Sequence, residues 1–287
     1  MLVHDGTGQH QLCRRGRRPA GAVRGLWWRR GATSQAASSD LDDPVHRAMV
    51  DAAWRDFLIG LCGIRFTGTW VSRPEVTARA ENKLVQLDAA RKAGLLVPTT
   101  VITQDPAEVR GLWEVTSGRL VVKAQRSAGG FTYPTRRLAQ EDLDRTAAIK
   151  LAPAIYQEEV PGVSHLRTHW LGTRFLTVRV RSKALDWRRD LGVPMEVAAL
   201  PSEIEYQLTK MFLQLGLAFG VCDLKESPDG KVHFLEVNPQ GQFAFWDALI
   251  PGANVCSAVA NYLLALSRGD VVLPNPEISS RDLPGVC

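Results

Sequence analysis

The stretch Phe234-Leu-Glu-Val-Asn-Pro-Gln-Gly-Gln242 decides how this sequence is interpreted. Side chains on a strand alternate between its two faces, so Glu236 and Asn238 share one face. Just before it, the turn residues Ser227-Pro-Asp-Gly230 join two apolar runs, 219–225 and 231–237. This pattern is typical of a hairpin, which brings Asp223 within a residue or two of the position opposite Glu236.

Asp223, Glu236 and Asn238 therefore converge on one patch. Two carboxylates and an amide oxygen form a set of hard oxygen ligands suited to Mg²⁺ bound together with phosphates. Taken alone, the segment 236–239 fits solvent-facing strand residues equally well. Asp223 across the hairpin favours a metal site, because clustered acids repel one another unless a cation joins them.

Composition describes an ordinary globular chain with a basic end. The 287 residues have a formal net charge of +5, and 45% are hydrophobic. Seven arginines lie in residues 1–30, where Asp5 is the single acid, and the rest of the chain is close to neutral. A basic tail on a neutral body does not indicate a nucleic-acid partner, and no zinc-finger or RNP-type motif occurs.

The five cysteines are far apart and form no C-x-x-C pair, so neither a zinc site nor a disulfide framework is indicated. The N-terminus lacks the apolar segment of a secretory signal. The most apolar stretch, 211–222, is too short to span a bilayer. We therefore expect a cytoplasmic protein without a membrane partner.

Strands and helices mix along the chain without a regular βαβ alternation, which favours an α+β fold. Apolar spacing predicts helices over 44–62, 74–92 and 203–216, and a helix beginning at Asp105-Pro106. Strands are expected over 97–103, 120–123 and 154–160 and within 168–181, besides the two strands of the hairpin.

The order of several motifs resembles that of the ATP-grasp superfamily of carboxylate ligases. They are Lys83, Lys123, Tyr156-Gln-Glu-Glu-Val160, Asp223 and Glu236-x-Asn238. Three more pieces, Trp27-Trp-Arg-Arg30, Leu185-Asp-Trp-Arg188 and Asn238-Pro-x-Gly-Gln242, resemble the peptide maturases that make microviridin-like graspetides. The resemblance covers residues 26–265, most of the chain.

The resemblance implies roles for the residues that match these motifs. Asp223, Glu236 and Asn238 would bind Mg²⁺, as two ions. Lys123 would reach the adenine side and the α-phosphate of ATP, and Lys83 would be a second phosphate lysine, although a lysine within a helix is more often simply solvated. The loop residues Arg126, Ser127, Gly129 and Gly130 would close on the β- and γ-phosphates, where glycine permits unusual φ angles. Gly-Gly also occurs in many ordinary turns.

The remaining implied contacts concern the base, the ribose and the reacting groups. Main-chain groups of Glu159 and Val160 would read the adenine edge, and Glu158 would accept from its amino group. The alternative is an edge strand with exposed acids. His165 stands where the family has a ribose-binding acid, and a neutral imidazole can still bond a hydroxyl. Arg167 and Arg181, with Arg179, would neutralise the acyl phosphate.

By the same resemblance, two α+β subdomains grip ATP behind a shortened pre-ATP-grasp region. We expect a basic, partly disordered remnant over 1–40, a helical link over 41–118, a lid subdomain over 119–160, a metal-binding subdomain over 161–275 and a tail over 276–287. With so short an N-terminal region, Trp27 and Trp28 would lack their normal packing partners.

The implied activity is an ATP-dependent ligation. A carboxylate would be phosphorylated to an acyl phosphate, which a hydroxyl or amine then displaces. The expected partner is a ribosomal precursor peptide whose Asp or Glu joins a Ser, Thr or Lys of the same chain, and a homodimer is left open. Two alternatives remain, an intermolecular carboxylate–amine ligase and a non-catalytic peptide-binding relic. Loss of one water per bond distinguishes cyclisation from addition of an acceptor.

Overall fold

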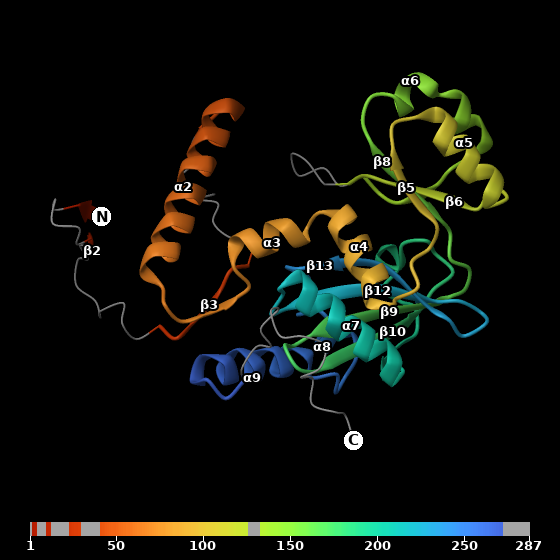
Figure 1. The fold of residues 1–287 in the computed structure, drawn as a ribbon. Helices are drawn as coiled ribbons and strands as arrows, with labels where there is room; N and C mark the ends of the chain where they lie inside the picture. Colours follow the sequence, from red (N-terminus) through yellow and green to blue (C-terminus); the bar gives the residue numbers. More distant parts are fainter. Residues whose placement is uncertain (1, 5–9, 13–22, 30–40, 126–132, 272–287) are drawn as a thin grey trace.

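The computed structural model describes residues 2–4, 10–12, 23–29, 41–125 and 133–271. Two antiparallel sheets and the helices packed on them form the body (Figure 1). The strands are β1 (Leu2–His4), β2 (His10–Leu12), β3 (Gly25–Trp27), β4 (Thr69–Val71), β5 (Thr100–Thr103), β6 (Leu120–Lys123), β7 (Arg136–Arg137), β8 (Ala154–Glu158), β9 (Ser164–Trp170), β10 (Phe175–Arg181), β11 (Met195–Ala198), β12 (Gly220–Glu226) and β13 (Val232–Asn238). The helices are α2 (Pro44–Arg65), α3 (Pro74–Ala80), α4 (Lys83–Ala93), α5 (Pro106–Val115), α6 (Thr146–Ile149), α7 (Ser202–Leu215), α8 (Trp246–Leu249) and α9 (Val255–Arg268), with 3₁₀ turns η2 (Gln140–Asp144) and η3 (Trp187–Arg189).

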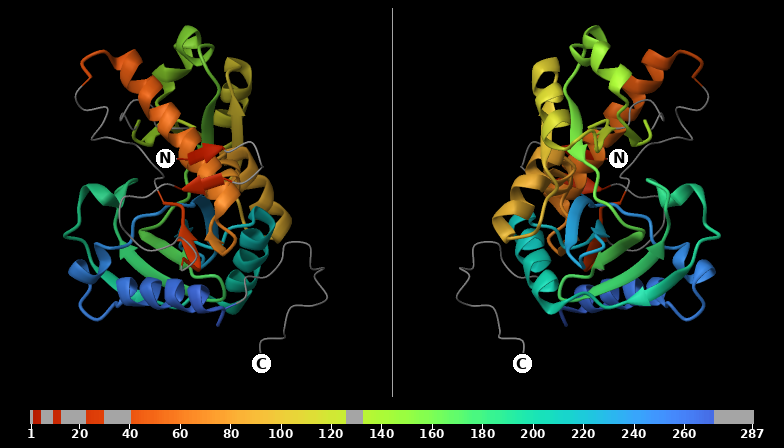
Figure 2. Two further views of the ribbon diagram at one scale, coloured as in Figure 1. Left: turned by 90° about the vertical axis from the view of Figure 1, so that its left-hand side faces the viewer. Right: turned by 90° about the vertical axis from the view of Figure 1, so that its right-hand side faces the viewer.

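The larger sheet has the strand order β11-β10-β9-β12-β13, with every neighbouring pair antiparallel. Helices α4 and α7 cover one face, where they share a core with alternate residues of β9, β12 and β13. Helix α9 packs under the same sheet from the other side (Figure 2). The sheet is thus the middle layer, and its strands fix which side chains face which layer. The fold is the expected α+β class.

Helix α7 shows why the apolar spacing was sufficient to predict these elements. Leu208, Met211, Phe212 and Leu215 are buried, and their spacing places them on one stripe of the helix. Gly216 ends the helix with a φ of 71°, a left-handed conformation that glycine adopts without steric cost. The helix expected over 203–216 is confirmed within a residue.

The smaller sheet has the order β5-β8-β6-β7, and α5 and η2 pack on it around a separate core. In Figure 1 this unit stands above and to the right of the larger sheet. Because β5 pairs with β8, the unit begins at Thr100 and not at the boundary expected at 119. Separation in sequence hid this pairing, since α5 and β6 lie between the two strands.

The single helix expected over 74–92 is in fact two. Helix α3 ends at Ala80, and Asn82 begins α4 by accepting hydrogen bonds from the backbone N–H groups of Leu84 and Val85 at 3.0 and 3.4 Å. An Asn side chain at this position satisfies N–H groups that have no partner inside the helix. Lys83 therefore occupies the first residue of a helix and not its middle.

Trp27 does have packing partners, so the expectation that it would lack them is wrong. Its ring stacks on Phe243 with centroids 5.9 Å apart and meets Phe219 edge-on at 5.4 Å. The guanidinium of Arg29 lies 5.4 Å from the Trp27 ring centroid. Strand β3, which carries Trp27, pairs in parallel with β4. The larger part of the remnant expected over 1–40, and the tail over 276–287, fall outside the described residues.

Helix α2 confirms the helix expected over 44–62 and continues to Arg65. Asp43 caps it by accepting from the backbone N–H of Val45 at 2.7 Å. All 22 of its residues are described, and none is buried. Figure 1 shows it at the left of the molecule, apart from the larger sheet. Among the described helices, none is long and apolar enough to cross a membrane.

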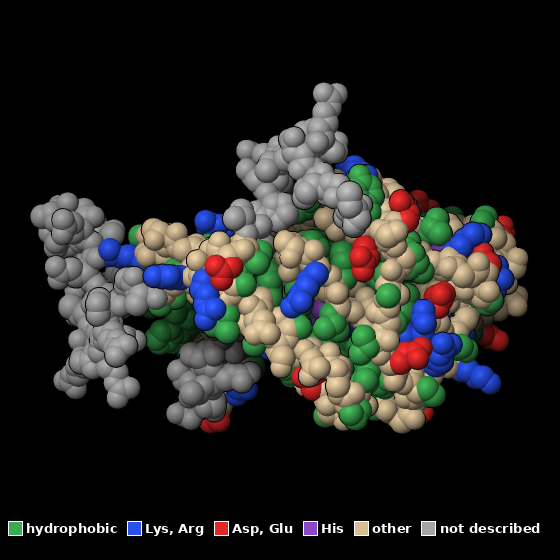
Figure 3. Space-filling view, turned by 90° about the horizontal axis from the view of Figure 1, so that it is seen from below, with side chains coloured by type: hydrophobic (Ala, Val, Ile, Leu, Met, Phe, Trp, Pro, Cys, Tyr) green, Lys and Arg blue, Asp and Glu red, His purple; other side chains and the backbone are tan. Residues whose placement is uncertain are grey.

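The surface seen from below in Figure 3 carries acidic and basic side chains interspersed over its described part. On the described part of this face, no extended patch consists of side chains of one charge alone. This agrees with the near-neutral body computed from the sequence.

Trp27→Ala is expected to lower the free energy of unfolding by about 2–3 kcal/mol, because it removes a large ring from two aromatic contacts at the edge of a core. Urea denaturation measures the change. The matched control is Trp54→Ala on α2, where the ring is 43% exposed and a loss below about 1 kcal/mol is expected. Equal losses in the two variants would contradict the packing described for Trp27.

Candidate active site

The carboxylates of the predicted hairpin face each other across a strand pair. Asp223 on β12 is in register with Glu236 on β13, and the pairing shifts immediately after Asp223. Asn238, two residues beyond Glu236, lies on the same face. Its side-chain oxygen accepts the backbone N–H of Gln240 at 2.9 Å. The structure therefore brings together all three residues predicted as metal ligands.

A cation holds each of the two carboxylates. The Lys83 amine lies 2.7 Å from a carboxylate oxygen of Glu236. The Arg167 guanidinium donates to Asp223 at 2.6 Å, and these two residues are directly opposite on β9 and β12. Two adjacent negative charges are thus compensated by side chains from two other elements, α4 and β9.

The electrostatics of Glu236 follow from this arrangement. Burial raises the pKa of Glu236, but the charges of Lys83 and Lys123 and the hydrogen bond from Lys83 outweigh it and lower the pKa to about 2. The side chain is therefore an anion throughout the neutral range. An anionic oxygen is the form that binds a hard divalent cation.

Lys123 is the last residue of β6, which confirms the strand expected over 120–123. Its amine donates to the side-chain oxygen of Gln157 at 2.7 Å, and the Gln157 amide in turn donates to Thr100 at 2.9 Å. Burial lowers the pKa of Lys123, whereas the negative charge of Glu236 opposes that shift. A Lys amine fixed in this way can meet a phosphate at a defined position.

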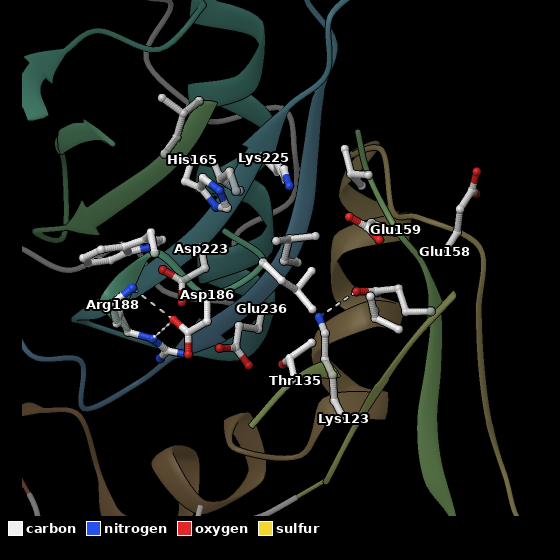
Figure 4. Close-up of a pocket in the computed structure, with 18 residues that line it drawn as sticks. Lys123, Thr135, Glu158, Glu159, His165, Asp186, Arg188, Asp223, Lys225 and Glu236 are labelled. Carbon is white, nitrogen blue, oxygen red and sulfur yellow. Dashed lines mark hydrogen bonds and ion pairs between the residues drawn. The ribbon is translucent and has the colours of Figure 1, made fainter. Parts of the chain in front are cut away.

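A pocket lies between the two sheets, over these side chains (Figure 4). Residues of both sheets line it, from β6 and β8 on one side and from β9, β12 and β13 on the other. A smaller hollow adjoins it beside Lys83, Lys123 and Glu236. Five of the predicted nucleotide residues line the larger pocket: Lys123, Glu158, Glu159, Val160 and His165.

The segment 158–160, expected to contact adenine, already uses several of its polar groups in contacts within the protein. The backbone N–H of Glu159 donates to the Arg119 carbonyl at 2.9 Å, so it is already used within the small sheet. The Glu159 carboxylate pairs with Arg137 at 2.6 Å. In Figure 4 the Glu158 side chain points away from the pocket, and it accepts from the Thr99 hydroxyl at 3.0 Å.

His165 lines the pocket and is only 6% exposed. Burial and the nearby charge of Lys225 lower its pKa to about 4, so the imidazole is neutral at pH 7. One ring nitrogen lies 3.3 Å from the Ser182 carbonyl. A neutral imidazole can hydrogen-bond a hydroxyl, so the ribose contact expected of His165 stays a prediction.

Arg181 is not part of this site, contrary to its predicted role. On an antiparallel pair, residues directly opposite point to the same face, and Arg181 is opposite Ser164 whereas Arg167 is opposite Val178. Arg167 and Arg181 therefore lie on opposite faces of the larger sheet. Arg181 pairs with Glu196 at 3.4 Å. Arg179 shares a face with Arg181, as expected. It therefore also lies on the face of the sheet opposite to Asp223 and Glu236.

Sequence reasoning missed Asp186 and Arg188 as site residues. Both line the pocket, and Figure 4 shows them beside Asp223 and Glu236. Asp186 accepts from two nitrogens of the Arg188 guanidinium at 2.7 and 3.1 Å, which fixes the arginine in place. The hydrogen bonds that Arg188 donates to Asp186 raise the pKa of Arg188, and the charges of Asp223 and Glu236 add to the effect. The motif 185–188 was a signal for the pair, but it carried no geometry.

The glycine-rich loop predicted to close on the phosphates, with Arg126, Ser127, Gly129 and Gly130, lies outside the described residues. The described part of the site nevertheless fits Mg²⁺ and a nucleotide. Its metal-binding groups are the hard oxygens of Asp223, Glu236 and Asn238 on one face of the sheet, and lysine and arginine side chains lie around them. No group of three His, Cys, Asp or Glu side chains among the described residues could hold a metal alone. Phosphate and water oxygens would complete the coordination of a set of two carboxylates and one amide.

No model of a known protein family and no curated protein matches the sequence. Solved structures do. Macrocyclase MdnC from Microcystis aeruginosa MRC, bound with precursor peptide MdnA, is similar with a TM-score of 0.76 and 26% identity over 92% of this chain and 82% of that chain. A RiPP-associated ATP-grasp ligase from Chryseobacterium gregarium, in complex with ADP and a leader and core peptide, has a TM-score of 0.73 and 21% identity over 88% and 78%. ATP-grasp ligase PsnB, complexed with minimal precursor, Mg and ADP, has a TM-score of 0.70 and 23% identity over 85% and 79%.

The lowered pKa of His165 predicts an acid-sensitive fold. Between the folded value of about 4 and the ordinary value of 6.5, the unfolded chain binds a proton that the folded chain excludes, so stability falls as pH falls through this window. We expect His165→Gln to reduce the slope of unfolding free energy against pH by about 1 kcal/mol per pH unit near pH 5.5. Urea denaturation at several pH values measures the slope. An unchanged slope would show that His165 is not shielded from protonation.

Proposed function

We propose that the chain is an ATP-grasp ligase that matures ribosomal peptides, and that it closes ester or amide rings in a precursor peptide. The carboxylate would come from an Asp or Glu side chain of that peptide. The group that displaces phosphate would be a Ser or Thr hydroxyl or a Lys amine of the same peptide. The similar macrocyclase MdnC is bound with a precursor peptide, which supports this partner.

One observation carries the proposal: the Asp223–Glu236 pair lines a pocket, and cations flank the two carboxylates. Lys83 and Arg167 contact the pair directly, and Arg188 approaches it from the side. A pocket of this charge pattern suits a substrate that is itself multiply negative and is carried with a divalent cation. ATP with Mg²⁺ is a substrate of that charge.

We propose that the nucleotide lies along the small sheet, with its base against 158–160 and its α-phosphate toward Lys123. Because the Glu159 N–H is already bonded, the main-chain groups of Val160 would contact the base edge. His165, neutral and pocket-lining, would bond a ribose hydroxyl. Lys83, beside Glu236, would contact the phosphates nearest the metal ligands.

Asp223, Glu236 and Asn238 would hold Mg²⁺, as two ions. When bound, the metal offsets the negative charge on the phosphoryl group that is transferred. On binding, the pair with Lys83 would be partly replaced, which frees the lysine for a phosphate oxygen. Glu236 is already ionised, so no proton has to leave it first.

The chemistry has two balanced steps. A peptide carboxylate oxygen forms a bond to the γ-phosphorus, and the bond from that phosphorus to ADP breaks, with its electron pair leaving on ADP. A hydroxyl or amine then attacks the acyl carbon, and phosphate departs with the electron pair of the broken C–O bond. The nucleophile loses its proton, which phosphate can accept. The residues bind, orient and neutralise charge, which is the main contribution of proteins to phosphoryl transfer.

We place Arg188, and not Arg181, beside the reacting carboxylate. Arg188 lines the pocket, and Asp186 fixes its guanidinium through two hydrogen bonds. A planar guanidinium matches a carboxylate or an acyl phosphate through paired N–H groups. Arg167 lies deeper and would act by holding Asp223.

Glu236→Gln is expected to lower the rate of ring formation about 100-fold or more, because it removes the anionic oxygen proposed to bind metal. Mass spectrometry counts the waters lost from a precursor peptide supplied with ATP and Mg²⁺. The matched control is Glu226→Gln, since Glu226 is on β12 but on the opposite face, where it accepts from Ser164. Full ring formation by Glu236→Gln would contradict the proposed role of Glu236 in binding Mg²⁺.

Arg188→Ala is expected to slow ring formation about 100-fold, with little change in ADP binding, because its guanidinium faces the carboxylate and not the base. Arg189→Ala, which changes the neighbouring exposed arginine, is the control and should stay close to the unaltered enzyme. Initial rates of ATP consumption with the precursor, together with calorimetric ADP affinities, measure both effects. Parallel losses in the two variants, or an unaffected Arg188→Ala, would contradict the placement.

A further inference from the structure

Gln86 is a fully buried polar side chain beside the proposed metal site, with 0% of it exposed. It lies on α4, three residues after Lys83. Its amide nitrogen donates to the Ala80 carbonyl at 2.7 Å and to the Val237 carbonyl at 2.8 Å. Its amide oxygen accepts the backbone N–H of Val237 at 3.0 Å.

Gln86 thereby acts on the outer edge of the larger sheet. Strand β13 is the last strand in the order, so the outward N–H and C=O of Val237 have no further strand to pair with. A glutamine amide carries one acceptor and two donors, which lets it bond both groups as a neighbouring strand would. Val237 lies between Glu236 and Asn238. The hydrogen bonds therefore hold the backbone from which both proposed ligands project.

The same turn of α4 also supplies Lys83. The lysine amine contacts Glu236 at 2.7 Å and lies 3.5 Å from the Gln86 amide oxygen. Just before the helix, Glu81 accepts from the Gln240 side chain at 2.7 Å. The segment 81–86 thus contacts the strand segment 236–240 at three successive places.

We propose that Gln86 is a positioning residue that fixes β13 against the start of α4, so that Glu236 and Asn238 stand at the correct separation from Lys83 to hold a metal-bound phosphate. The inference rests on the proposed function of this site. Gln86 acts through the backbone of Val237 and does not touch the nucleotide. Its loss should weaken the cooperation between metal and nucleotide more than it weakens nucleotide binding itself.

The test compares ADP binding with Mg²⁺ and with EDTA by isothermal calorimetry. Gln86→Met keeps the length of the side chain and removes its hydrogen bonds. We expect the Mg²⁺-dependent gain in ADP affinity to fall about tenfold in this variant. The control is Tyr262→Phe on α9, which deletes the buried hydrogen bond that the Tyr262 hydroxyl donates to the Ala218 carbonyl. It should keep the full gain, although it also loses a buried polar contact.

An unchanged gain in folded Gln86→Met would overturn the positioning role and leave the proposed function intact. If the unaltered protein shows no Mg²⁺-dependent gain, the metal role of Asp223 and Glu236 itself fails. Circular dichroism checks folding. Should Gln86→Met not fold, Gln86→Glu decides the matter. It keeps the acceptor for the Val237 N–H and loses both donations, so a reduced gain is expected and a full gain contradicts the proposal.

Discussion

The rest of the site depends on the charge balance around Asp223 and Glu236, two carboxylates that face each other across a pair of strands. Adjacent anions in a partly buried place are stable only when cations compensate them. Lys83 and Arg167 provide that charge at 2.7 and 2.6 Å. Under the proposed function, the compensating side chains would exchange part of their contact for phosphate oxygens when a metal joins the carboxylates. The same charge balance would then serve both folding and substrate binding.

The fold delivers these charges from elements that are distant in sequence. The hairpin of β12 and β13 sets the carboxylates in register, and β9 places Arg167 directly opposite Asp223. The break between α3 and α4 puts Lys83 at the beginning of a helix, and Gln86 ties that helix to the edge of β13. The small sheet then closes the pocket from above with Lys123. Each contribution is fixed by backbone geometry, so the reacting groups require little reorganisation.

Much of this was readable from the sequence where a local rule sufficed. The turn 227–230 predicted the hairpin, and the hairpin predicted that Asp223 and Glu236 meet, which the register confirms. Rules of local spacing could not decide the face of Arg181, because that depends on how β10 pairs with β9. They also missed the N-cap at Asn82, because the apolar spacing continues through 74–92 as in a single helix. The aromatic contacts of Trp27 were missed because they join β3 to residues about 200 positions away in the sequence. The motif 185–188 marked Arg188 without showing where it lies.

The fate of the carboxylate oxygen tests the central claim most directly. A precursor peptide whose Asp and Glu carboxylates carry heavy oxygen is incubated with the protein, ATP and Mg²⁺, and the released phosphate is analysed by mass spectrometry. Activation as an acyl phosphate transfers one carboxylate oxygen to phosphate for every ring closed, so the account predicts one heavy oxygen per phosphate formed and ADP as the other product. Phosphate without heavy oxygen, or AMP and pyrophosphate in place of ADP, would contradict it.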